Sequence, residues 1–140
     1  MGVVRVLAVD PGGRRYGLAV GDDATGLAGP LTVIDATGVA QVARRIAAEV
    51  ERLEAAAVVI GLPTGADGAE TPACARSHAL AAALAELGIE TRLQPEHLTT
   101  NEARRRARSS GRPAAAPVDD LAAQIILEEH LAARRLGGGE

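Results

Sequence analysis

The chain has 140 residues, 47% of them apolar, and a formal net charge of −3. This length suits one domain with a buried core, and the negative charge does not indicate a general nucleic-acid binder. Phe and Trp are absent, so the core must be built from Ala, Val, Leu and Ile, and the single cysteine excludes an internal disulfide.

Three strands are expected at the start of the chain. An apolar run over 3–9 ends at Asp10, and Pro11-Gly12-Gly13 follows it directly. Strand-like runs over 15–21 and 30–35, with short turn-rich connections, predict an antiparallel hairpin or meander. A carboxylate at the end of a central strand, facing a glycine turn, lies where α/β sheets place their active sites.

Helices and strands alternate after residue 37. The expected elements are an amphipathic helix over 38–53, a strand over 55–62, a helix from Pro72 that stops at Gly88, a strand over 89–93, a helix that begins with a capping box of Thr99 and Glu102, a mobile loop over 109–117 and a helix over 118–136. This order predicts an α/β protein with a five-stranded mixed sheet, its first three strands antiparallel, flanked by helices. We expect a single domain over 1–136 and a flexible glycine-rich tail over 137–140.

Three acidic residues are candidates for a shared metal site. Asp10 ends the first strand, Glu96 lies just beyond a later strand, and Asp119 is in the first turn of the last helix. Small residues at Ala122 and Ala123, on the face of Asp119, would let that helix lie close to the sheet. Carboxylate oxygens are ligands that Mg²⁺ and Mn²⁺ prefer, although each acid taken alone is more readily explained as a cap or a loop residue. Together they predict metal-dependent hydrolysis of a phosphodiester.

Positive charge is concentrated between Thr99 and Pro117, where five arginines and one acid give a net charge of +4. Arginine suits bidentate contacts with phosphate. A solvated helix face explains the same run equally well, so the composition leaves both interpretations open.

Three blocks of the sequence resemble the YqgF/RuvX family, Holliday junction resolvases also described as nucleases that mature the precursor of small-subunit ribosomal RNA. The blocks are Leu7-Ala8-Val9-Asp10-Pro11-Gly12 with Gly17-Leu18-Ala19-Val20, then Val58-Val59-Ile60-Gly61-Leu62-Pro63 with Asp67-Gly68, then Glu96 with Leu98-Thr99-Thr100, Glu102-Ala103, Val118-Asp119, Ala122-Ala123 and Ile125-Ile126-Leu127. They span nearly the whole chain. The resemblance implies an RNase H-like fold, in agreement with the order of strands and helices.

Carried over by position, the acidic triad of the family falls on Asp10, Glu96 and Asp119, which would hold Mg²⁺ or Mn²⁺. Asp120, about a hundred degrees further round the helix, is expected to face solvent or to cap. The residues expected to contact substrate phosphates are Arg14, Arg15, His97, Arg104, Arg105 and Arg108. Such contacts predict little base specificity and a marked salt dependence. The expected partners are a ribosomal RNA precursor or branched DNA and a pre-ribosomal particle, with the protein a monomer or homodimer.

The sequence departs from the family pattern at three places. Gly13-Arg14 replaces Thr-Lys, Pro95-Glu96-His97 replaces Asp-Glu-Arg, and Ala114-Ala115-Ala116-Pro117 replaces a basic stretch. The changes at Gly13, Pro95 and His97 favour an alternative, a nucleic-acid- or ribosome-associated binding protein with weakened catalysis. The loss of the basic stretch instead argues against tight binding of the substrate. A weaker alternative is a nucleotide-binding protein, because Asp10-Pro11-Gly12 also resembles the phosphate loop of actin-like and sugar kinases, which need a second domain.

The remaining polar candidates receive structural interpretations. His78 and His130 are expected at the surface, and Cys74 in the core. No apolar run approaches the ~20 residues of a membrane helix, and no signal peptide precedes the first strand. We therefore expect a soluble, cytoplasmic protein with no membrane partner.

Overall fold

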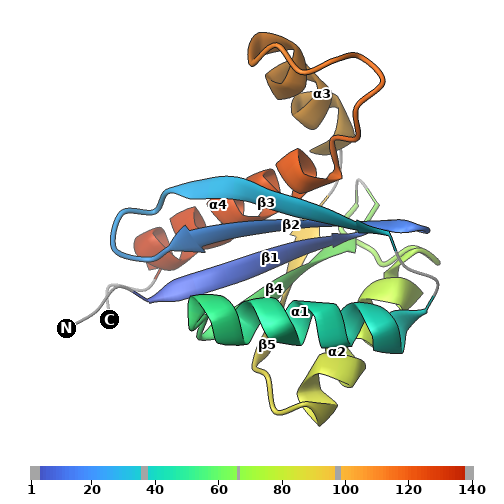
Figure 1. The fold of residues 1–140 in the computed structure, drawn as a ribbon, viewed down its shortest axis with the longest axis vertical. Coiled ribbons are helices and arrows are strands. Elements are labelled where there is room, and N and C mark those ends of the chain that lie inside the picture. The colour runs from blue at the N-terminus through green and yellow to red at the C-terminus, as the bar shows by residue number, and fades with distance from the viewer. Residues whose placement is uncertain (1–3, 36–37, 66, 97–98, 138–140) are drawn as a thin grey trace.

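The computed structural model describes residues 4–35, 38–65, 67–96 and 99–137 (Figure 1). The elements are β1 (Arg5–Pro11), β2 (Arg15–Asp22), β3 (Ala28–Asp35), α1 (Val39–Leu53), β4 (Ala57–Pro63), α2 (Cys74–Glu86), β5 (Thr91–Glu96), α3 (Thr99–Ser109) and α4 (Asp119–Gly137). The strands form one sheet in the order β3-β2-β1-β4-β5. β1, β2 and β3 are antiparallel, whereas β4 and β5 run parallel to β1. The predicted class and mixed sheet are confirmed.

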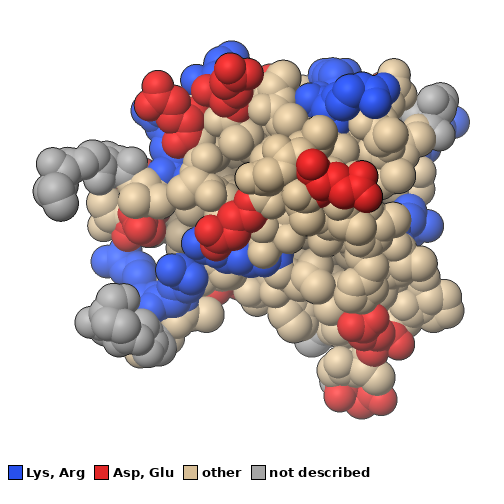
Figure 2. Space-filling model, turned by 90° about the horizontal axis from the view of Figure 1, so that it is seen from below, with Lys and Arg blue, Asp and Glu red and all other residues tan. Residues whose placement is uncertain are grey.

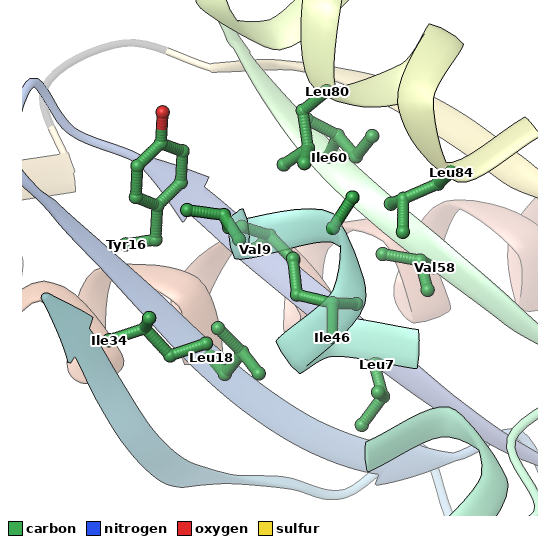
Figure 3. Packing of buried hydrophobic residues seen from close by; sticks show 12 residues of the cluster. Leu7, Val9, Tyr16, Leu18, Ile34, Ile46, Val58, Ile60, Leu80 and Leu84 are labelled. Atoms are coloured by element: carbon green, nitrogen blue, oxygen red, sulfur yellow. The ribbon is translucent and has the colours of Figure 1, made fainter. Parts of the chain in front are cut away.

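The sheet is covered on both faces, α1 and α2 on one and α4 on the other (Figure 1). Large aliphatic side chains fill the α1/α2 face (Figure 3). Alternate residues of β1, Leu7 and Val9, point there and meet Ile46 of α1 and Leu80 of α2 within one buried cluster. Because successive side chains of a strand point to opposite faces, a strand buried on both faces is apolar throughout, which explains the continuous apolar run of β1.

The α4 face has a different composition. The β1 residues that alternate with Leu7 and Val9 are Val6, Ala8 and Asp10, and they pair with Gly21, Ala19 and Gly17 of β2. This face therefore presents small side chains where the other presents large ones. Ala123, Leu127 and Leu131 of α4 pack against it.

Within the described ranges, no helix is long and apolar enough to cross a membrane.

Some expected boundaries are corrected by the structure. β5 runs from Thr91 to Glu96, so Glu96 is the last residue of the strand and does not lie beyond it. α2 begins at Cys74 because the N–H of Cys74 bonds to Thr71 O at 2.9 Å, a tight i−3 turn that places Pro72 before the helix. Gly88 does end α2, with φ +81° and its N–H bonded to Ala85 O at 3.0 Å.

α3 projects beyond the sheet and packs against the first half of α4 (Figure 1). Their contact is a separate small cluster of Ala103, Ala107, Leu121, Ala122 and Ile125. Gly111, at φ +82°, ends α3 with the same hydrogen-bond pattern as Gly88 ends α2. The N-cap role expected for the Thr99 side chain lies outside the described residues. α4 extends through Gly137, and the rest of the expected tail is likewise outside them.

Candidate active site

Asp10 and Asp119 meet at one edge of the sheet because Gly17 has no side chain. Gly17 lies beside Asp10 in the pairing of β1 with β2. A Cβ atom on Gly17 would lie 1.9 Å from the backbone O of Asp119 and 2.6 Å from Asp120 N. Only glycine therefore admits the first turn of α4 onto the strand, and this close approach carries the Asp119 carboxylate to the Asp10 edge.

The two carboxylates repel each other. Burial, together with the charge of Asp119, raises the pKa of Asp10 to about 6. Asp119 also accepts a hydrogen bond from Arg15 Nε, which donates to Oδ1 at 3.1 Å. A half-buried pair of like charges is a place where a bound cation lowers the energy.

Glu96 lies on the same sheet face but not in the same cluster. It pairs with Pro63 of β4, and Gln94, two residues earlier on β5, contacts His130 of α4. Its side chain is 7% exposed. β4 separates β5 from β1, so about two strand spacings, roughly 10 Å, separate the strands that carry Glu96 and Asp10. Among the described residues, no three acidic, histidine or cysteine side chains form an assembled metal site.

The Asp10–Asp119 pair fits a divalent metal ion by its donor chemistry. Mg²⁺ and Mn²⁺ take carboxylate oxygens and retain water, and a dication between two carboxylates would offset the repulsion that raises the pKa of Asp10. The floor beside the pair is glycine, and a Cβ on Gly12 would lie 3.6 Å from Asp119 Oδ2. The joint ligand role of Asp10, Asp119 and Glu96 stays a prediction.

Two clefts lie near Asp119; one is lined by Asp119 itself and the other by Val118 and by Arg15, the ion-pair partner of Asp119. The acidic cleft, about 200 Å³, is lined by Gly12, Gly13, Arg14, Arg15 and Asp119. The arginine cleft, about 280 Å³, is lined by Arg15, Arg104, Ala107, Arg108, Arg112, Pro113, Ala114, Ala115, Ala116, Pro117 and Val118. Arg15 is common to both, so the clefts are neighbours that share one side chain.

The residues expected to contact substrate differ in which of the two clefts they line. Arg14 lines the acidic cleft, Arg15 lines both clefts, and Arg104 and Arg108 line the arginine cleft. Arg105 is exposed, lines neither cleft and pairs with Glu102 on its own helix. His97 lies outside the described residues.

Sequence reasoning missed an ion pair that fixes the loop after α3. Arg112 donates to Asp120 through Nη1 at 2.8 Å and through Nη2 at 3.2 Å, and to Pro117 O at 3.0 Å. Asp120 was expected to face solvent or to cap; its carboxylate is only 13% exposed and also accepts the N–H of Leu121 at 3.0 Å. No local pattern pairs residues 112 and 120, because the contact depends on how the loop closes.

The close approach of α4 to Gly17 was also not predicted, although the sequence contained a signal for it. Small residues alternate along β2 at Gly17, Ala19 and Gly21, which indicates a face approached closely by another element. The surface assignment of His130 was wrong: its side chain is 9% exposed, between Arg92 and Gln94, because α4 lies across β5 there. Cys74 is buried, as expected, and His78 is exposed.

Solved structures define the class of fold. The chain is similar to T. thermophilus RuvC in complex with Holliday junction substrate, with a TM-score of 0.59 and 20% identity, covering 96% of each chain. It is also similar to the Fowlpox virus resolvase in its complex with Holliday junction DNA, with a TM-score of 0.54 and 11% identity, over 93% of this chain and 98% of that one. The fold is thus RNase H-like, as the resemblance implied, with the mixed sheet that the order of elements predicted.

The family follows from the sequence comparisons. The model of the RuvX family, described as Holliday junction resolvase, matches residues 4–133. A protein of Streptomyces avermitilis named "Putative pre-16S rRNA nuclease" is 36% identical over 96% of this chain and 89% of its own length. A protein of Anaeromyxobacter sp. with the same name is 38% identical over 94% of this chain and 98% of its own length. The chain belongs to the RuvX family, a family of hydrolytic nucleases.

Proposed function

We propose that this protein is a metal-dependent nuclease that hydrolyses phosphodiester bonds in the precursor of 16S ribosomal RNA. The observation that carries the proposal is the pair of Asp10 and Asp119 at the end of the central strand, beside a cleft lined by arginines. The names of the curated relatives support ribosomal RNA as the substrate. Processing of that precursor would require the protein to act in the cytoplasm, on or near a pre-ribosomal particle.

Asp10 and Asp119 would hold Mg²⁺ or Mn²⁺, with Glu96 at the same edge as the third acidic ligand. When bound, such an ion lowers the pKa of a coordinated water and stabilises the leaving oxygen of a phosphodiester. Arg14 at the mouth of the acidic cleft would orient the scissile phosphate. Arg15 holds Asp119 in place by its hydrogen bond and faces both clefts.

Recognition would depend on the phosphate backbone. Tyr16, the single aromatic residue of the chain, is buried on the α1/α2 face, so it offers no platform on which bases could stack. We therefore expect weak base specificity and an affinity that falls steeply with salt.

A four-way DNA junction is the second candidate substrate, favoured by the description of the matching family model. Symmetric cleavage of a junction needs two active sites, and hence a homodimer. A monomer that cleaves single-stranded precursor RNA but leaves the junction intact would favour the ribosomal substrate.

The test is a cleavage panel of precursor RNA, single-stranded DNA and a four-way junction, each with Mg²⁺, Mn²⁺ or chelator. We expect metal-dependent cleavage that Asp10→Asn abolishes and Asp23→Asn, at the exposed β2–β3 turn, leaves unchanged. Cleavage by Asp10→Asn at the parental rate would refute the proposal. RNA binding without any cleavage by the parent protein would instead support the alternative, a binding protein with weakened catalysis.

A further inference from the structure

The arginine cleft is a second, cationic cavity next to the acidic pair. It lies between α3 and the loop over 112–118, and four arginines line it together with small and apolar residues. No acidic side chain is among its lining residues. Its volume of about 280 Å³ can admit a tetrahedral anion together with some of its water.

The arginines of this region are not equivalent in their charge balance. Arg15 pairs with Asp119, and Arg112 pairs with Asp120. On α3, Arg105 pairs with Glu102, and Arg106 pairs with Glu102 and Glu128.

Arg104 and Arg108 differ from these. In the part of the chain that the structure describes, neither has an ion-pair partner. Four residues apart, they lie on the same face of α3, and both line the arginine cleft. Two uncompensated guanidinium groups thus face one cavity.

The wall opposite α3 is already fixed. The N–H of Arg112 bonds to Ala107 O at 2.9 Å, and its guanidinium joins Pro117 O and Asp120. These bonds tie both ends of the loop to α3 and α4, so an anion would not have to order the loop when it binds. Guanidinium groups suit phosphate because they donate two parallel hydrogen bonds.

We propose that the arginine cleft is a phosphate-binding subsite that holds one phosphate group of the nucleic-acid strand through Arg104 and Arg108. The subsite is distinct from the acidic pair, which would hold the metal, and the role of its ligand as a substrate strand rests on the proposed nuclease function. Because Arg15 lines both clefts, a strand bound in the arginine cleft would extend past Arg15 toward the acidic cleft. The phosphate is either an internal phosphodiester or a terminal monophosphate.

The test is RNA binding without metal. A labelled 12-nucleotide single-stranded RNA is titrated with full-length protein in chelator, and fluorescence anisotropy gives Kd at several salt concentrations. We expect Arg104→Ala and Arg108→Ala each to weaken binding about tenfold, and the double variant more, with a flatter salt dependence by ~0.7 per arginine removed. Arg105→Ala, on the same helix with the same charge change, should stay within about twofold of the parent. Equal losses of RNA affinity in Arg105→Ala and Arg104→Ala would show that binding depends only on the overall positive charge of α3, and would overturn the proposed subsite.

The two sources of phosphate are separated by the RNA end. If a 5′-phosphate strengthens binding over a 5′-hydroxyl, and Arg104→Ala/Arg108→Ala removes that gain, the subsite takes a terminal phosphate. Equal binding of both RNAs, still weakened by the double variant, identifies an internal phosphodiester. Binding of both RNAs by the double variant at parental affinity contradicts the proposal. Circular dichroism and thermal unfolding confirm that α3 remains folded.

The fate of this subsite is separable from that of the nuclease proposal. Binding is measured without metal, whereas cleavage requires it. A parent protein that never cleaves but shows the contrast between Arg104 and Arg105 retains the subsite and loses the nuclease function. Cleavage that depends on Asp10, without a difference in RNA binding between Arg104→Ala and Arg105→Ala, retains the nuclease function and rules out the subsite.

Discussion

The two faces of the sheet use the same strands for different purposes. On the α1/α2 face, β1 contributes Leu7 and Val9 to a cluster of large aliphatic side chains. On the α4 face, the alternating residues are Ala8 and Asp10, opposite Ala19 and Gly17. Large side chains fill the space between layers, whereas small ones let the backbone of a helix approach and bring a polar group with it. Both faces bury apolar side chains and contribute to stability, and the α4 face in addition positions the acidic pair.

Charge is distributed differently at the two ends of the molecule. The end seen in Figure 2, away from α3, shows acidic and basic groups interspersed around a largely uncharged centre. The α3 end carries the arginine cleft, where the lining residues are basic or uncharged. An overall charge of −3 thus conceals a local site suited to phosphate.

The largest effect on stability is expected when a side chain is added on the α4 face of the sheet, at Gly17. Gly17→Ala places a carbon 1.9 Å from a backbone oxygen of α4, and a backbone cannot move aside as a flexible side chain can. We expect a loss of more than about 3 kcal/mol in the free energy of unfolding, measured by urea denaturation. Gly29→Ala in β3, where a Cβ meets nothing within 4 Å, is the control and should not destabilise. A Gly17→Ala protein as stable as the parent would show that α4 does not rest on this residue.

The opposite kind of change removes a large side chain from the α1/α2 face. Ile46→Ala removes a fully buried side chain from the aliphatic cluster and should cost about 3 kcal/mol, for the lost burial and the cavity left behind. The affinity for Mn²⁺, measured by calorimetry at a temperature where both proteins are folded, should not change. An altered affinity would mean that the two faces are coupled and would weaken the comparison.

The acidic pair should itself reduce stability in the absence of metal. The pKa of Asp10 is about 6 in the folded protein, above its ordinary 3.8, so the folded state binds the proton more tightly than the unfolded state. The associated stability is complete below about pH 3.8 and is lost as pH rises through 6. Asp10→Asn should therefore raise the free energy of unfolding by on the order of 3 kcal/mol at pH 8, with little gain at pH 4.

Metal provides the check on that prediction. Mg²⁺ or Mn²⁺ should raise the Tm of the parent at pH 8 and leave the Tm of Asp10→Asn nearly unchanged, because the variant lacks one anionic ligand. If both proteins gain equally, the ion binds elsewhere.

The smallest effect is expected at His130, on the α4 face but away from the acidic pair. Burial lowers the pKa of His130, and the charges of Arg92 and Arg134 lower it further. Below about pH 6.5 the unfolded chain takes up a proton that the folded protein resists, so stability should fall as pH drops from 7 to 5.5. His130→Leu should flatten that part of the Tm profile, and an unchanged slope would assign the pH dependence to other groups.

Local patterns predicted much of this fold. The 3.6-residue period over 38–53 became α1, and the continuous apolar run before Pro63 became β4, buried on both faces. Gly88 ended α2 because a left-handed residue is needed there, which is a local requirement. The boundary of β5 was misjudged because Gln94 and Glu96 are polar; they extend the strand by pairing with β4, a contact that local composition cannot reveal.

By itself, the sequence determined the class of fold, the strand that ends in Asp10 and the concentration of arginines in α3, since periodicity, turn chemistry and charge are properties of neighbouring residues. The tertiary structure decided which acids meet and which arginines keep their charge uncompensated. The Arg15–Asp119 contact joins residues 104 positions apart, and the Arg112–Asp120 pair depends on the closure of a loop. The first of these contacts requires the backbone of α4 to lie against β2 at Gly17, and which element would approach that small residue is decided only by the tertiary fold.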